Sequence, residues 1–318
     1  MVNEVATEEF SRITKSSKEV FYDPLFLLAT AKANKSNLKY FVFYKKSTPL
    51  IALALFIKGN DIVLPSSFLF YSGVWVSDNL ESKQSRDALV ECLLFLKQTY
   101  NKVELCLPLS LTDIRPFMWL DFDIRIRHTF IKKTGSKNFA EDVLNNYKRS
   151  LDLGLSFLDH SSEELDWPLF KEQLKSFNLP IFKINRMKDW LVNLHSLGMI
   201  FQFAVIKEGK KLGSAILLND GANKKAYFLL RKIPESDIRK FVNCFLYVEV
   251  LNFLDHLHYL NLDYMGANIR SIAEFKSRFK PQLQVNYIVF HKKQLISIKN
   301  LKRKLKYYTI KLLNYFNR

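Results

Sequence analysis

Apolar and polar positions recur with two different periods along this chain of 318 residues, and the period predicts each element in turn. Apolar residues three and four positions apart are typical of helices, whereas dense β-branched and aromatic runs are typical of strands. In the first half the pattern predicts helices over 24–33, 82–100 and 113–120, strands over 39–45, 50–57, 61–64, 102–107 and 124–131, and an extended segment over 70–76.

The second half shows the same mixture of periods. Its predicted helices cover 139–152, 162–177, 186–197, 235–258 and 271–279, and its predicted strands cover 200–207, 212–219, 225–231, 260–265 and 283–290. The connections Glu208-Gly209-Lys210-Lys211 and Asp220-Gly221 are ordinary hairpin turns, so the three strands beginning at 200, 212 and 225 are expected to form a meander.

Both halves therefore follow the same order: a helix, a three-strand meander, a long helix, a strand, a short helix and a strand. A chain of this length is also expected to form two domains, at ~100–200 residues each. The polar stretch Lys132 to Asn138 is the expected boundary between them. We therefore expect an α/β protein with mixed α+β sheets, in which residues 1–137 and 138–291 form two domains of similar design and residues 292–318 follow as a separate segment.

The C-terminal segment accounts for much of the net charge of +17, because residues 292–318 hold nine Lys or Arg and no acid. Its apolar residues lie three and four apart, which predicts a basic amphipathic helix. Such a helix fits docking on the core, attachment to an anionic membrane surface, or binding to tRNA or another partner. The apolar positions are Leu295, Ile298, Leu301, Leu305, Tyr308, Leu312 and Tyr315.

The rest of the composition indicates the compartment. No apolar run approaches the ~18 residues of a membrane span, and the N-terminus lacks the basic and apolar regions of a signal peptide. Cys92, Cys106 and Cys244 are widely spaced within apolar runs, which favours buried thiols over a disulfide framework. We expect a cytoplasmic protein, at most peripheral at the inner face of the membrane, and no DNA partner.

The segment from Asp263 to Ser271 carries the most informative candidate chemistry. A predicted strand ends at Gly266, and glycine is scarce in this chain, with nine in all. Ser271 and Glu274 have the spacing of a capping box at a helix start. The free N–H groups of a helix start attract anions, and Arg270 adds positive charge beside them. The segment therefore fits either an anion-binding site or an ordinary strand-to-helix corner.

A metal site is not expected. The chain has six histidines and no cluster of Cys and His, so the usual ligand sets are missing. His256 and His258 are two positions apart, which places them on different faces of a helix.

The segment from Leu262 to Phe279 resembles the late motif of the FemAB-like branch of the GNAT acyltransferase superfamily. That motif has an acid, an aromatic residue, a glycine, a polar loop, then Phe-Lys and a closing Phe. The branch includes CelD-like proteins of polysaccharide loci and Fem-type peptidoglycan aminoacyltransferases. Further segments that resemble the branch are Tyr147 to Ser150, Gly213 to Leu230 and Tyr71 to Gly73, so the resemblance covers roughly residues 20–291.

The resemblance implies two fused GNAT-like domains that transfer an acyl or aminoacyl group to an amine, with donor and acceptor meeting between or beside them. It assigns Asp263 to orienting or deprotonating the amine and Lys276 to stabilising negative charge. It further implies substrate or donor contacts, with phosphate contacts at Lys148, Arg149 and Arg270 and other contacts at Tyr71, Tyr227, Gly266 and Asn268. The acceptor that it implies is an amino sugar or amino acid of an envelope polysaccharide or its precursor.

The donor is left open by one departure from the family. GNAT enzymes that use acyl-CoA usually hold the pyrophosphate on a glycine-rich loop before the long helix, but Arg231 to Asp237 contains no glycine and two acids. Acyl-CoA is therefore one expected donor and aminoacyl-tRNA, with a peptidoglycan precursor as acceptor, is the alternative. No permanently bound cofactor is expected. A non-catalytic member that binds a membrane or an assembly partner is the third interpretation.

Overall fold

The elements follow the predicted order in both halves of the chain. The computed structural model describes residues 2–64, 70–77 and 82–293. The predicted amphipathic helix over 292–318 therefore lies almost wholly outside the described residues, and so does its predicted contact with a membrane. None of the helices in these ranges combines the length and the hydrophobicity of a transmembrane span.

The first half contains two elements that the periodicity did not predict, β1 (Val2–Val5) and α1 (Thr7–Thr14). The predicted elements follow, with ends that shift by a few residues. They are α2 (Pro24–Asn34), β2 (Asn37–Lys45), β3 (Thr48–Lys58), β4 (Asp61–Ile62), β5 (Gly73–Val76), α3 (Lys83–Thr99), β6 (Lys102–Cys106), α4 (Arg115–Trp119) and β7 (Asp123–Lys133). A short 3-10 helix ahead of α2, η1 (Val20–Tyr22), was not predicted either.

The second half repeats this order after an added helix and strand. Its elements are α5 (Glu141–Asp152), β8 (Ser156–Asp159), α6 (Trp167–Ser176), α7 (Ile181–Ser196), β9 (Ile200–Lys207), β10 (Lys210–Asp220), η2 (Gly221–Asn223), β11 (Lys225–Lys232), α8 (Arg239–His256), β12 (Asn261–Asp263), α9 (Arg270–Ser277) and β13 (Gln282–Lys292). Strand β8 was not predicted, and α6 is shorter than the helix predicted over 162–177.

One prediction about the start of α9 was wrong. Ser271 and Glu274 do not form a capping box, because the helix already begins at Arg270 and Ile269 occupies the N-cap position without a side-chain bond. Glu274 instead pairs with Arg270 one turn earlier, at 2.7 Å. The spacing of a motif alone could not show which residue begins the helix.

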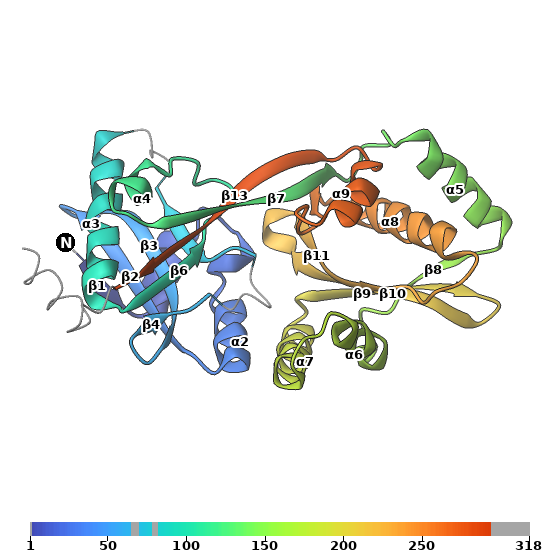
Figure 1. Cartoon of the computed structure of the whole chain (residues 1–318), viewed down its shortest axis with the longest axis horizontal. Coiled ribbons are helices and arrows are strands. Elements are labelled where there is room, and N and C mark those ends of the chain that lie inside the picture. The colour runs from blue at the N-terminus through green and yellow to red at the C-terminus, as the bar shows by residue number, and fades with distance from the viewer. Residues whose placement is uncertain (1, 65–69, 78–81, 294–318) are drawn as a thin grey trace, which may run out of the picture.

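A single mixed sheet runs through both halves. Its strand order is β1-β2-β3-β4-β6-β13-β7-β12-β11-β10-β9-β8, with β5 beside β3. Strand β13, the last strand of the second half, joins the two halves of the sheet. It pairs antiparallel with two strands of the first half, β6 on one side and β7 on the other. Figure 1 shows β7 and β13 as two long strands that run from one half of the molecule to the other.

Helices cover both faces of the sheet and create three hydrophobic clusters. In the first half α3 packs on one face, with Leu89, Leu93 and Leu96 buried. In the second half α8 packs on the corresponding face together with α5 and α9. The third cluster lies on the opposite face and includes residues of η1, α2, α6 and α7 from both halves. This shared cluster holds the halves together and surrounds the candidate site.

Candidate functional site

The candidate site lies where two parallel strands of the second half separate. Strands β11 and β12 pair only over three positions, from Lys225 beside Asn261 to Tyr227 beside Asp263. Strand β12 ends at Asp263, whereas β11 continues to Lys232. On the other side of β12, Asp263 lies beside Ile131 of β7. Beyond Asp263 the edge of β11 that faced β12 is therefore without its strand partner.

Asp263 is completely buried at this point, with 0% of its surface exposed. Its carboxylate accepts three hydrogen bonds. The hydroxyl of Thr129 and the backbone N–H of Met265 donate to Oδ1 at 2.5 and 2.9 Å, and the hydroxyl of Tyr71 donates to Oδ2 at 2.9 Å. Because buried carboxylates require such partners, these bonds stabilise Asp263. They also join the first half, through Tyr71, to the second.

Lys276 holds the loop that follows Asp263. Its ammonium donates to the backbone carbonyls of Tyr264, Met265 and Gly266, at 2.6, 3.0 and 2.9 Å. All three of its N–H donors are therefore used inside the protein. Burial, with the positive charge of Arg231 second, lowers the pKa of Lys276 to about 8, although the charge of Asp263 opposes this shift.

The loop needs its glycine for its backbone conformation. Gly266 has φ +85°, which side chains disfavour, whereas a Cβ there would make only an ordinary contact with the ring of Phe70, at 3.9 Å. Asn268 closes the far end of the loop, because its Oδ1 accepts a hydrogen bond from the backbone N–H of His128 at 3.0 Å. Gly266, Asn268 and Lys276 thus give one fixed shape to the backbone beside Asp263.

Three aromatic rings pack together beside Asp263. Tyr71 and Tyr227 lie 6.3 Å apart between ring centroids, and Phe21 packs edge-on against both, at 5.2 and 5.1 Å. The ammonium of Lys225 lies over the rings of Tyr227 and Tyr71, at 4.8 and 6.0 Å. Burial, followed in each case by nearby negative charge, raises the pKa of both tyrosines, so their hydroxyls stay protonated.

Glu19 is a candidate that the sequence patterns missed. It immediately precedes η1, and the backbone N–H of the next residue, Val20, donates to Oδ2 of Asp220 at 3.2 Å. Burial raises the pKa of the Glu19 carboxyl, while Lys225 lowers it and Asp220 raises it. Among the residues that the structure describes, its half-buried carboxylate has no hydrogen-bond or ion-pair partner. An incompletely compensated carboxylate of this kind is suited to accept a proton or a cation.

Arg127 is a second residue that was missed. Its guanidinium lies 5.0 Å from the centroid of the Phe70 ring, and Nη1 lies 3.7 Å from Sγ of Cys106. Its positive charge also acts on Tyr71. Within the described ranges it pairs with no carboxylate. No sequence motif marks Glu19 or Arg127, because only the fold brings residues 19, 127, 225 and 263 together.

Three residues that the resemblance assigned to phosphate contacts lie elsewhere. Lys148 and Arg149 are exposed on α5, which belongs to the cluster on the other face of the sheet from Tyr71 and Tyr227. Arg149 is 3.9 Å from Asp152 on the same helix. Arg270 has 93% of its side chain exposed and pairs with Glu274. The structure therefore brings Asp263, Lys276, Tyr71, Tyr227, Gly266 and Asn268 together, but not these three.

The connection between β11 and α8 is occupied by its own side chains. The guanidinium of Arg231 lies over the rings of Tyr247 and Phe275, at 5.4 and 5.2 Å, and donates to Asn243 at 2.5 Å. Glu235 pairs with Arg239 at the first position of α8. The acids and the engaged arginine make this helix start a poor place for a pyrophosphate.

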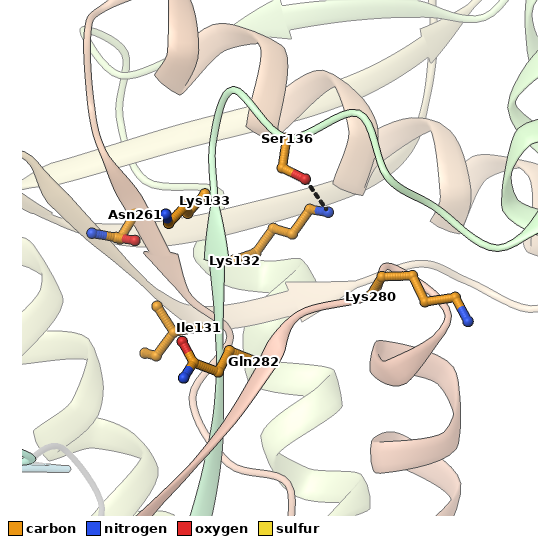
Figure 2. Close-up of a pocket in the computed structure, with 7 residues that line it drawn as sticks. All are labelled: Ile131, Lys132, Lys133, Ser136, Asn261, Lys280 and Gln282. Atoms are coloured by element: carbon orange, nitrogen blue, oxygen red, sulfur yellow. Dashed lines mark hydrogen bonds between the residues drawn. The ribbon is translucent and has the colours of Figure 1, made fainter.

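A small cavity of about 200 Å³ lies at the end of β7. Three lysines contribute to its lining, Lys132, Lys133 and Lys280. Figure 2 shows the Lys132 ammonium turned toward Ser136 and that of Lys280 pointing away from it. Lys132 donates to Ser136 Oγ and to the carbonyl of Asn138, at 3.2 and 2.7 Å. These charges do not converge on one point, so we assign no anion to the cavity.

Comparison with known proteins identifies the fold. No protein-family model and no curated protein matches the sequence. Among solved structures the chain is similar to FemX, with a TM-score of 0.62 and 12% identity over 90% of this chain and 96% of that one. It is also similar to a tandem GNAT protein from the clavulanic acid biosynthesis pathway, with a TM-score of 0.57 and 8% identity over 91% and 97% of the two chains.

A third similar structure is the C-terminal domain of a protein assigned as a lysylphosphatidylglycerol synthetase in Agrobacterium fabrum. Its TM-score is 0.57 and its identity 11%, over 90% of this chain and 92% of that one. At such identities the likeness concerns the fold. The chain has the FemAB-like fold with two tandem GNAT-like domains, which confirms the fold that the resemblance predicted.

Proposed function

We propose that this protein is an N-acyltransferase that acylates an amine of an amino sugar or amino acid in the synthesis of an envelope polysaccharide or its precursor. The observation that carries the proposal is the half-buried carboxylate of Glu19 at the junction of the two halves, which has no hydrogen-bond or ion-pair partner among the residues that the structure describes. It lies near Lys225 and Tyr227, one strand away from the buried Asp263 network. The fold, shared with GNAT proteins and FemX, supports the same reaction class.

The reaction needs an uncharged amine close to an acyl carbonyl. Glu19 accepts a proton from the incoming ammonium, and the neutral amine then attacks the carbonyl carbon. A C–N bond forms, the bond between the carbonyl carbon and the sulfur or oxygen of the donor breaks, and a second proton passes from the attacking nitrogen to that leaving sulfur or oxygen. Backbone N–H groups on the open edge of β11, beyond Tyr227, supply donors for the oxyanion.

Asp263 and Lys276 act as positioning residues in this proposal. Asp263 has no accessible surface and accepts three hydrogen bonds, so it orients Tyr71 instead of removing a proton from the substrate. The ammonium of Lys276 donates its three hydrogen bonds to backbone carbonyls and so keeps the loop at Gly266 in place. Arg127, which has no carboxylate partner among the described residues, provides positive charge for an anionic group of either substrate.

One observation favours an acyl donor other than acyl-CoA. The connection from Arg231 to Asp237 has no glycine, and Arg231 is held by Asn243 and two rings. An acyl-CoA pyrophosphate would have to displace these contacts. Aminoacyl-tRNA, with a peptidoglycan precursor as acceptor, is therefore the alternative pair of substrates.

The two donors are distinguished by one set of assays with the purified full chain. Acyl-CoA is offered with a panel of amino sugars and amino acids, and release of the CoA thiol is followed. Charged tRNA is offered with a peptidoglycan precursor, and transfer of the labelled aminoacyl group is followed with and without RNase. Thiol release would support the acyl-CoA donor, and RNase-sensitive transfer the alternative. If neither donor binds or reacts, the proposal fails and a non-catalytic binding role is favoured.

Replacing Glu19 with glutamine is expected to lower kcat by about 100-fold, because proton transfer by a positioned side chain contributes factors of this order. In the parent protein, activity should fall as the pH drops through the raised pKa of Glu19, since the protonated carboxyl cannot accept another proton. The variant should lack this acidic limb. The measurement is the pH profile of kcat/KM for both proteins.

The matched control is Glu8→Gln, which removes one charge from an exposed position on α1. Its activity should stay within a factor of about two, as for most surface changes. A Glu19→Gln variant with the same pH profile as the parent would exclude Glu19 as the proton acceptor.

A further inference from the structure

The corner between α6 and α7 exposes large apolar side chains. Phe177, Ile181 and Phe182 have 59%, 55% and 51% of their surfaces exposed, and Leu179 between them is half-buried. We call these four residues the apolar corner. Single exposed apolar residues are common, but a group of large ones within six positions marks an interaction site.

Only Leu179 of the apolar corner packs against the shared cluster, and Phe177, Ile181 and Phe182 are not needed to hold the two helices on the protein. Helix α6 docks through Trp167, Phe170 and Leu174, which are buried. Helix α7 docks through a separate stripe with helical spacing, formed by Ile184, Met187, Trp190, Leu191 and Leu194. Phe177 follows the end of α6, and Ile181 and Phe182 begin α7 ahead of that stripe. Figure 1 shows α6 and α7 on the side of β9 and β10 opposite to α8.

Positive charge predominates on the two helices that flank the apolar corner. Residues 171–189 contain five cations and two acids, Glu172 and Asp189. None of the five cations forms an ion pair within the described part of the chain. The guanidinium of Arg186 lies 5.4 Å from the centroid of the Phe182 ring, which belongs to the apolar corner. The cations are Lys171, Lys175, Lys183, Arg186 and Lys188.

We propose that the apolar corner inserts into the surface of an anionic membrane, with the five cations contacting the lipid headgroups. The aromatic and aliphatic side chains of the apolar corner can insert at the boundary between headgroups and acyl chains. Lys and Arg side chains without ion-pair partners among the described residues can bind the headgroups of anionic lipids. The charge favours a membrane over a protein as the binding partner of the apolar corner. Protein interfaces are depleted of lysine, and four of these five cations are lysines. The proposal does not depend on the reaction proposed above.

A local probe separates this contact from any made by the C-terminal segment. The three native cysteines are all buried, so a Phe182→Cys variant of the full chain can be labelled selectively with an environment-sensitive fluorophore. Its emission should shift to the blue with vesicles of phosphatidylcholine and phosphatidylglycerol. The shift should be much smaller with phosphatidylcholine alone. The control label is Leu144→Cys, at an exposed apolar position of α5, which should not shift with either vesicle.

The strength of binding is tested by removing the apolar corner. The triple variant Phe177→Ser/Ile181→Ser/Phe182→Ser should bind the anionic vesicles about tenfold more weakly than the parent, because it loses the inserted apolar surface. The matched control, Leu144→Ser/Leu151→Ser on α5, removes two residues of similar exposure and should bind like the parent.

Three outcomes would overturn the proposal. In the first, vesicles bind the chain but the label at position 182 does not respond, which would place the contact elsewhere. In the second, the label responds to protein concentration without lipid, which would make the corner an interface between copies of the chain. In the third, the triple variant binds as tightly as the α5 control.

Discussion

Replacing Asp263 with alanine should lower the free energy of unfolding by about 4 kcal/mol, because three buried donors lose their acceptor at once. The donors are the hydroxyls of Tyr71 and Thr129 and the backbone N–H of Met265. The alanine variant also removes the negative charge that raises the pKa of Lys276, so that buried ammonium becomes less favourable. The measurement is urea unfolding followed by circular dichroism.

Two controls separate the buried network from the loss of any carboxylate. Asp263→Asn keeps the shape of the side chain and an oxygen that can accept from Met265, so it should cost only about 1.5 kcal/mol. Asp142→Ala removes an exposed carboxylate that pairs with Arg278, and should cost less than about 1 kcal/mol. If Asp263→Ala were no worse than Asp142→Ala, the network would not be what joins the two halves at this point.

Replacing Lys276 with methionine should also destabilise the protein strongly, by about 3 kcal/mol, because three buried carbonyls lose their donor. The side chain keeps much of its volume, so the loss concerns hydrogen bonds more than packing. Activity should fall with stability, because the loop at Gly266 is no longer held. The control is Lys280→Met, at an exposed position, which should stay within about 0.5 kcal/mol of the parent.

The same lysine gives a pH dependence with a definite sign. The pKa of Lys276 is lowered from 10.5 to about 8 in the folded protein. Between these two values the unfolded chain binds more protons than the folded one, so this group makes stability rise with pH. The stability difference between the parent and Lys276→Met should therefore grow by about 2.5 kcal/mol from pH 7 to about pH 10. A difference that shrinks over this range would contradict the lowered pKa.

Local patterns carry most of the information about the elements. The repeated order of helices and strands was predicted from hydrophobic spacing, since each spacing depends only on the geometry of its own segment. Segments with weak local signals were missed. Strand β8 has only Phe157 partly buried between more exposed neighbours, and β1 is four residues long, so neither shows a clear alternation.

The candidate site likewise contains residues that a local sequence pattern marks and residues that only the fold brings together. Asp263, Gly266 and Lys276 were found because they lie within 14 residues, in a segment that resembles a family motif and contains a glycine that must adopt positive φ. Tyr71 was found by resemblance as well, but its hydrogen bond to Asp263 joins residues 192 positions apart. Glu19 is placed by its neighbour Val20, whose backbone N–H donates to Asp220, 200 positions away, and neither Glu19 nor Asp220 has a local signal.

By itself, the sequence determined most of the segments that become helices and strands, and where the loop after Asp263 must turn, because these depend on side-chain period and backbone conformation. Only the tertiary structure decided that β13 would join both halves into one sheet, and that Lys276 would point at three carbonyls instead of a substrate. It also placed Glu19 beside Lys225. Those arrangements arise from pairing between distant strands and from burial, and neither can be read from the order of residues along one segment.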